Sequence, residues 1–146
     1  MYRSSEPAAQ ARWHQLDRTH QNAVLALTEQ LRGDLFDLIL INAGISGPSP
    51  QNLLQSSDAE LAQLFLTNAI APVRSAETLL PLLGAQKGVI ASTTSILGSL
   101  NENSQAARPV YAASKAALNM LTRALLPQTE AHCHAAVTAP WLGENR

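Results

Sequence analysis

The sequence predicts an α/β fold with a parallel β-sheet, and three observations lead to this prediction. Segments with apolar residues at helical spacing alternate with short apolar runs of strand length. One of these runs, Leu35–Ile41, is nearly all apolar, which is typical of a strand buried on both faces of a parallel sheet. Hydrophobic residues make up 46% of the 146 residues and charged residues 14%, which is enough to build a core. Alternating strands and helices favour parallel strands joined by right-handed crossovers.

The composition also limits the domain organisation and the function class. Residues 1–146 fit a single domain of ordinary size. The formal net charge of −1 and the scattered aromatic residues argue against a nucleic-acid partner. No apolar run is long enough for a membrane span or a signal peptide, so we expect a cytoplasmic protein. A single cysteine excludes an internal disulfide, and His132-Cys133-His134 lacks a further ligand, so no metal site is expected.

The first part of the chain predicts a strand, a helix and a second strand. Ala11–Leu16 alternates roughly between apolar and polar residues, which indicates a strand. Thr19 is expected to cap a helix that buries Val24, Leu27 and Leu31 and that ends at Gly33. The apolar run Leu35–Ile41 then forms the first buried strand.

The rest of the chain predicts two helices and two strands. Ser57-Asp58-Ala59-Glu60 is a capping box, and the helix it begins is expected to continue past Pro72 and to bury Leu61, Leu64, Phe65 and Ile70. The β-branched run Gly88–Thr94 predicts a strand that ends at Ser95. A helix is expected from about Tyr111 to Leu126, and a last strand over Ala135–Ala139.

Pro72 lies within the long helix predicted after Ser57. Because proline has no N–H, the helical hydrogen bond that would reach the carbonyl of Asn68 cannot form, and we expect a kink there. The Asn68 carbonyl is then free to hold a water molecule. The alternative is a kinked core helix in which Asn68 only faces a neighbouring helix.

Tyr111 and Lys115 are four residues apart and therefore lie on one face of their helix. A phenol, whose pKa is ordinarily about 10, becomes a better proton donor when a fixed cation lowers that pKa. The pair therefore indicates a general acid in a cleft. The alternative is a surface tyrosine beside a solvated lysine.

Two further candidates stand at the ends of predicted strands, where ligands bind in parallel sheets. The Ser95 hydroxyl is placed to donate a hydrogen bond to a substrate carbonyl. Asn42-Ala43-Gly44 follows Leu35–Ile41, and Gly44 allows the backbone to approach a ligand closely. The alternatives are an ordinary serine at a strand end and ordinary turn residues.

Taken together, these residues resemble the short-chain dehydrogenase/reductase family. Asn42-Ala43-Gly44, Asn68, Ser95-Ile96-Leu97-Gly98 and Tyr111-Ala112-Ala113-Ser114-Lys115 occur in the order, and at about the spacing, of that family's motifs. The run that starts at Tyr111 and the long loop after Gly98 are most similar to the C-factor and sniffer-like carbonyl reductases. The resemblance covers nearly the whole chain and implies a Rossmann-like, doubly wound parallel sheet.

The resemblance implies the interconversion of a small-molecule carbonyl compound and an alcohol, with NADP or NAD as cofactor. By this analogy Tyr111 protonates the carbonyl oxygen as hydride arrives. Lys115 lowers the pKa of the family's tyrosine and holds the nicotinamide ribose. Ser95 orients the substrate carbonyl, and Asn68 holds a water that links Lys115 to solvent.

The same analogy places the rest of the cofactor and a partner subunit. Asp17 meets the adenine, Arg3 faces the 2′-phosphate of NADP, and Asn42, Ala43 and Gly44 line the adenosine side. Family members pair through two helices, so a homodimer or larger oligomer is expected through residues 57–83 and 111–126. Apolar surface for this contact is expected from Leu61, Leu64, Leu79, Leu118 and Leu121.

The sequence departs from the family pattern in two places. None of the seven glycines forms the Gly-x-x-x-Gly-x-Gly turn that binds the cofactor pyrophosphate, and the strand before that turn is missing. Ala139-Pro140-Trp141 stands where the family has Pro-Gly-Trp, shortly before the last residue. We therefore expect an incomplete sheet that is truncated at both ends relative to the family. The alternative function is a non-catalytic signalling or interaction protein, or a gene fragment, of the same ancestry.

Overall fold

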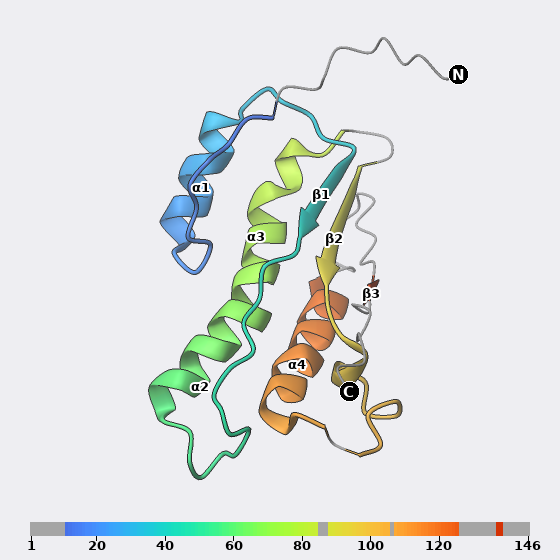
Figure 1. Cartoon of the computed structure of the whole chain (residues 1–146). Helices are drawn as coiled ribbons and strands as arrows, with labels where there is room; N and C mark the ends of the chain where they lie inside the picture. Colours follow the sequence, from blue (N-terminus) through green and yellow to red (C-terminus); the bar gives the residue numbers. More distant parts are fainter. Residues whose placement is uncertain (1–10, 85–87, 106, 126–136, 139–146) are drawn as a thin grey trace, which may run out of the picture.

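A three-stranded parallel sheet with helices packed against it forms the fold (Figure 1). The computed structural model describes residues 11–84, 88–105, 107–125 and 137–138. The strands are β1 (Leu38–Ile41), β2 (Val89–Thr93) and β3 (Val137–Thr138), and they lie side by side in that order. Ile39 pairs with Ile90, and Ser92 pairs with Val137, both in parallel register. The predicted α/β class with a parallel sheet is confirmed.

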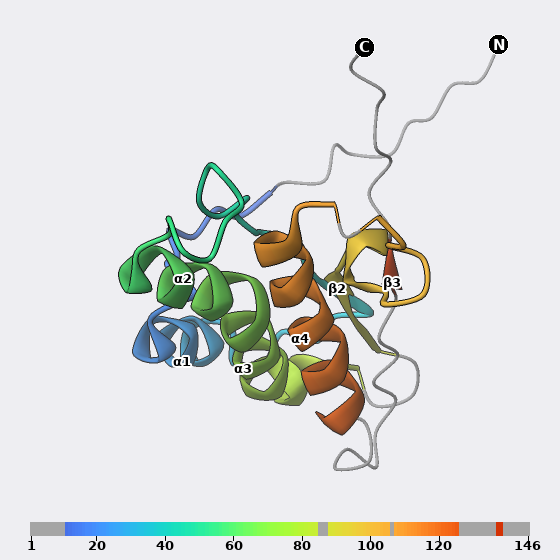
Figure 2. The same cartoon turned by 90° about the horizontal axis from the view of Figure 1, so that it is seen from below.

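The helices form a layer in which α3 lies between α1 and α4 (Figure 2). The elements are α1 (Gln21–Gln30), α2 (Asp58–Phe65), the π-helical turn η1 (Leu66–Ile70), α3 (Ala71–Leu79), η2 (Leu80–Leu82), η3 (Ile96–Gly98) and α4 (Pro109–Leu125). The capping box at Ser57 and Glu60 forms as the sequence predicts. None of the helices in the described part of the chain is long and apolar enough to cross a membrane.

The two faces of the sheet differ in burial. Ile41 and Ile90 pack against Ala76 of α3 and Leu125 of α4 in the core. Leu38 and Leu40 point to the other face and remain 59% and 56% exposed. The expectation that Leu35–Ile41 is buried on both faces is therefore wrong, because the described helices that build this core lie against one face only. Regular strand structure also starts later than expected, at Leu38, although Phe36 forms a bridge with Leu83.

Other corrections concern the first elements. Ala11–Leu16 forms no strand, since no described strand pairs with it, and Trp13 is 91% exposed. His20 rather than Thr19 is the N-cap of α1, because the Thr19 hydroxyl donates to Asp17 instead. Gly33 ends the turn after α1 in the left-handed region, with φ of 94°, as a helix stop requires.

Two of the apolar residues expected on the free helix surface are instead buried. Leu64 and Leu118 are buried within the chain, because α2 and α4 pack against each other and against η1. Ile70 is exposed, although the helical spacing predicted its burial, because the π-helical turn shifts the face on which it lies. The surface-facing apolar residues of α4 include Met120 and Leu121.

Candidate active site

Two strand ends and the first turns of α4 line an open cavity of about 260 Å³. Its lining residues come from the segments at and after the carboxyl ends of β1 and β2 and from the start of α4. Its lining residues are Asn42, Gly44, Ile45, Ser46, Thr93, Thr94, Arg108, Tyr111 and Lys115. The structure therefore brings together Asn42, Gly44, Tyr111 and Lys115 of the residues predicted from sequence.

Lys115 reaches this cavity from a buried position on α4. Only 4% of the residue is exposed, and Nζ donates a hydrogen bond of 2.9 Å to the carbonyl of Thr93 at the end of β2. Nζ lies 5.9 Å from the centre of the Tyr111 ring, as the four-residue spacing predicts. Burial lowers the pKa of Lys115 from its ordinary value, and repulsion from the Arg18 guanidinium lowers it further.

Tyr111 is half-buried in the first turns of α4. Its backbone N–H donates to the side-chain oxygen of Gln51 at 2.8 Å, which satisfies one of the free N–H groups at this helix end. The guanidinium of Arg108 lies over its ring, 4.7 Å from the ring centre. Arg108 itself adopts a φ of 50°, a backbone conformation that only a few per cent of non-glycine residues adopt.

Asn68 is fully buried next to the cavity, and its side chain uses both of its polar atoms. The amide oxygen accepts from the N–H of Ile45 at 2.9 Å, and the amide nitrogen donates to the carbonyl of Ile45 at 2.8 Å. The same nitrogen also donates to the hydroxyl of Ser114 at 3.1 Å. Asn68 therefore fastens the loop after β1 to α4.

The kink that Pro72 predicts takes the form of the π-helical turn η1. Within this turn the N–H of Ala71 reaches back five residues to the carbonyl of Leu66. In the same spacing, residue 72 would donate to the carbonyl of Thr67, but Pro72 has no N–H. The Arg18 guanidinium donates to that carbonyl instead, at 3.0 Å.

Ser95 follows β2 but does not line the cavity. The residue is buried, and its hydroxyl accepts from the N–H of Leu97 at 3.2 Å, which caps η3. Gly98, at the end of η3, lies so close to α4 that a Cβ there would come within 2.9 Å of the Lys115 backbone. This close approach places Ser95 and its loop beside the helix that carries Tyr111.

The residues expected to contact the nucleotide differ in where they lie and in their hydrogen bonds. The Asn42 side chain accepts from the Thr93 hydroxyl at 2.7 Å, and the Ala43 carbonyl accepts from Arg18. Asp17 is exposed and does not line the cavity, and hydrogen bonds from the Thr19 hydroxyl and N–H lower its pKa. Arg3 lies outside the described residues.

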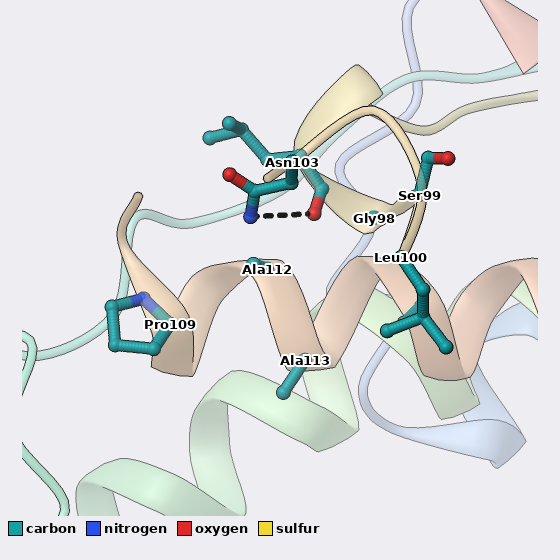
Figure 3. Close-up of a pocket in the computed structure, with 9 residues that line it drawn as sticks. Gly98, Ser99, Leu100, Asn103, Pro109, Ala112 and Ala113 are labelled. Carbon is teal, nitrogen blue, oxygen red and sulfur yellow. Dashed lines mark hydrogen bonds between the residues drawn. The ribbon is translucent and has the colours of Figure 1, made fainter. Parts of the chain in front are cut away.

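A second cavity, of about 350 Å³, lies between α4 and the loop that contains Gly98 and Asn103 (Figure 3). The Asn103 side chain donates to the carbonyl of Leu97 at 3.1 Å, which ties this loop together. The other lining residues are Ser99, Leu100, Pro109, Ala112, Ala113 and Ala116. None of the lining side chains titrates, so acid–base chemistry belongs to the smaller cavity.

No group of three or more His, Cys, Asp or Glu side chains is placed to hold a metal ion in the part of the chain that the structure describes. The sequence His132-Cys133-His134 lies outside that part.

Sequence reasoning missed three residues that shape this site. Ser114 is buried against Asn68, and it is the serine inside the motif from Tyr111 to Lys115. Arg108 lies over the Tyr111 ring without any sequence signal beyond its nearness to Tyr111. For Arg18 the sequence indicated only that a donor is needed, because a proline inside a helix leaves a carbonyl without its helical N–H.

Sequence comparison finds relatives along most of the chain. A sequence profile described as short chain dehydrogenase matches residues 3–140. C-signal of Myxococcus xanthus is 37% identical over 92 residues, which are 61% of this chain and 54% of C-signal. Protein FixR of Bradyrhizobium diazoefficiens is 35% identical over 108 residues, which are 70% of this chain and 38% of FixR.

Solved structures share the fold. A carbonyl reductase from Pseudomonas aeruginosa PAO1 in complex with NADP has a TM-score of 0.81 and 35% identity over 88% of this chain and 56% of that chain. The NADPH-bound carbonyl reductase from chicken fatty liver has a TM-score of 0.74 and 26% identity over 86% of this chain and 53% of that chain. The chain thus spans about half the length of these structures.

Proposed function

Because this chain belongs to the short-chain dehydrogenase family, we propose that it acts as an NAD(P)-dependent oxidoreductase on a small-molecule carbonyl compound or alcohol. The observation that carries the proposal is the shared cavity of Tyr111, Lys115, Asn42 and Gly44 at the carboxyl ends of β1 and β2. This edge is where parallel α/β sheets bind their ligands.

Tyr111 is proposed as the proton donor. Its ring is half-buried at the cavity, with the Lys115 ammonium 5.9 Å and the Arg108 guanidinium 4.7 Å from the ring centre. The phenol of Tyr111 would donate its proton to the carbonyl oxygen of the substrate as general acid. In the reverse direction the phenolate accepts the proton of the alcohol.

Lys115 and Asn68 support this proton transfer. The Thr93 carbonyl holds Lys115 in place, so that its remaining N–H bonds can reach ribose hydroxyls or water. The backbone carbonyl of Asn68 is proposed to hold the water that links Lys115 to solvent.

Ser95 is proposed to orient the substrate carbonyl. Its oxygen accepts from Leu97, and this leaves its O–H free to donate. The Gly98 contact with α4 fixes the loop that carries it. A preorganised donor of this kind acts on the carbonyl oxygen as negative charge develops there.

The residues present fit the nicotinamide half of NADP or NAD. Gly44 keeps the cavity floor open, because a Cβ there would lie 3.2 Å from the Asn68 amide oxygen and 3.7 Å from Lys115 Nζ. Tyr111 and Lys115 would hold the nicotinamide ribose, while Asn42, Ala43, Asp17 and Arg3 are proposed for the adenosine side. When bound, the cofactor supplies or accepts the hydride.

The test measures NADPH oxidation with a panel of aldehydes and ketones. Because the sequence holds no glycine-rich turn for the pyrophosphate, the assay uses an extended chain: the 146 residues preceded by the first strand, glycine-rich turn, helix and second strand of a family member. Tyr111→Phe should lower kcat by about a hundredfold or more, as loss of a general acid does. Tyr2→Phe, at the other tyrosine of the chain, is the matched control. Equal turnover by wild type and Tyr111→Phe would remove Tyr111 from the mechanism.

We also propose a cytoplasmic homodimer that pairs through residues 57–83 and 111–126. The exposed side chains of Ile70, Met120 and Leu121 on these helices support it, because a partner would cover their apolar surface. Light scattering of the extended chain at micromolar concentration should give the mass of a dimer or larger oligomer. A monomer mass would contradict the proposed contact.

A further inference from the structure

Arg18 reaches from the segment before α1 into the floor of the proposed active site. Its Nη2 donates to the carbonyl of Ala43, in the loop after β1, and to the carbonyl of Thr67, in η1, at 3.0 Å. Its Nη1 is buried and has no hydrogen-bond partner among the described residues. A single guanidinium thus joins three segments that are distant in sequence.

No carboxylate balances this charge in the described ranges. The ion pairs there involve Arg12 with Asp34, His20 with Asp17, and Arg32 with Glu29. Burial lowers the pKa of Arg18, which reports the cost of removing its charge from water. Arg18 is half-buried, and the backbone carbonyls it binds are the compensation for its partly desolvated charge.

One of those carbonyls has lost its helical donor. In the spacing of the π-helical turn, the N–H of residue 72 would bind the Thr67 carbonyl, and Pro72 has none. Arg18 supplies the missing hydrogen bond from outside the helix. The turn that carries Asn68 therefore depends on Arg18 for part of its hydrogen bonding.

The other carbonyl belongs to the residue before Gly44. Gly44 lies so close to Asn68 and Lys115 that a Cβ added there would be 3.2 Å from the Asn68 amide oxygen and 3.7 Å from Lys115 Nζ. A shift of Ala43 would therefore move the cavity floor relative to Lys115. Arg18 also acts on Lys115 through its charge, because it is the repulsive group that lowers the lysine pKa after burial.

We propose that Arg18 is a positioning residue of the proposed active site: its guanidinium fastens the Asn42–Gly44 loop to the π-helical turn that carries Asn68, in place of the hydrogen bond that Pro72 cannot give. This inference rests on the proposed function, since the geometry it fixes is that of the Tyr111–Lys115 cavity. A lysine would keep the charge but would lose the planar fork that binds two carbonyls at once.

The first part of the experiment is kinetic and uses the extended chain. Arg18→Met keeps much of the side-chain stem and removes both hydrogen bonds, so kcat should fall by about tenfold while KM for the carbonyl substrate changes little, as misplacement of reacting groups predicts. Arg18→Lys should recover part of that loss. Arg12→Met, at an exposed arginine paired with Asp34, is the matched control and should leave kcat unchanged.

The second part needs no turnover and is carried out on the 146-residue chain. The chain has two lysines, Lys87 and Lys115, so ¹³C-methylated lysine side chains give two assignable NMR signals. Of the charged or titratable groups near Lys115, Arg18 acts on it through its charge, Tyr111 lies beside it, and Arg108 lines the same cavity. Arg18→Met should raise the titration midpoint of Lys115 and leave that of Lys87 unchanged, whereas Arg18→Lys should keep the Lys115 midpoint low.

The two readouts separate this inference from the proposed function. If no extended chain oxidises NADPH, the proposed function fails, and the Lys115 titration still reports whether Arg18 acts on the cavity. If Arg18→Met matches Arg12→Met in kcat and in the Lys115 midpoint, Arg18 is not a positioning residue. Should Arg18→Met fail to fold, Arg18→Gln, which keeps one donor and removes the charge, takes its place with the same expected results.

Discussion

The chain leaves β1 and β2 at the same edge of the sheet, yet the two loops are held there in different ways. After β2, backbone packing fixes the loop, because Gly98 lies directly against α4 at Lys115. After β1, residues 42–46 are exposed, and side chains from other elements hold them. Packing therefore sets the position of Ser95, whereas a few hydrogen bonds set the position of the proposed nucleotide side.

If the two loops are held in these different ways, replacing Asn68 should lower the free energy of unfolding more than replacing Asn119. Asn68 is buried and makes three hydrogen bonds, two to Ile45 in the β1 loop and one to Ser114 on α4, so Asn68→Ala should cost about 2–4 kcal/mol of unfolding free energy. Asn119 bonds Thr94 at 2.6 Å and the Gly98 carbonyl at 3.4 Å, but packing also holds that loop. Asn119→Ala should therefore cost only about 1 kcal/mol.

Urea unfolding of the two variants and the wild-type chain measures both losses. Proteolysis provides a second readout, since Asn68→Ala should open the exposed β1 loop to cleavage while Asn119→Ala should not. Equal losses of unfolding free energy in the two variants would show that the two loops are held in the same way.

A smaller effect should come from the β2 side. A Cβ at Gly98 would lie 2.9 Å from the backbone carbon and Cβ of Lys115, so Gly98→Ala must push the loop away from α4. We expect a loss of about 1–3 kcal/mol, as overpacking causes. Gly33→Ala is the control for replacing a glycine without a steric clash, because no atom lies within 4 Å of a Cβ at this position. The stability lost in this control comes only from the positive φ of residue 33. Melting temperatures measure both, and a Gly98→Ala chain as stable as wild type would mean that the close approach does not fix the loop.

The elements that the sequence predicted well are those with local signals. The capping box at Ser57, the irregular helical turn before Pro72 and the helix from Tyr111 onward follow from hydrogen-bond rules that act within a few residues. The place of Asn42 and Gly44 follows from the parallel strands, whose carboxyl ends share one edge, and the cavity that they line with Tyr111 and Lys115 lies there.

The features that the sequence did not predict depend on partners distant in the chain. The exposure of Leu38 and Leu40 depends on which face the helices cover, and an apolar run is the same in either case. Arg18 reads as a surface residue until Ala43 and Thr67 are placed beside it. The partners of the Asn68 side chain were likewise not predictable, because Ile45 and Ser114 are 23 and 46 residues away in the sequence.

The most direct test of the proposed oxidoreductase follows the transferred hydrogen. The extended chain is incubated with a carbonyl compound and NADPH that carries deuterium at the transferring carbon, and the alcohol is examined by mass spectrometry. We expect deuterium on the alcohol carbon, formed at least about a hundredfold more slowly by Tyr111→Phe than by wild type. Saturable NADPH binding by the wild-type extended chain, without deuterium in the alcohol from any compound of the panel, would contradict the proposed function.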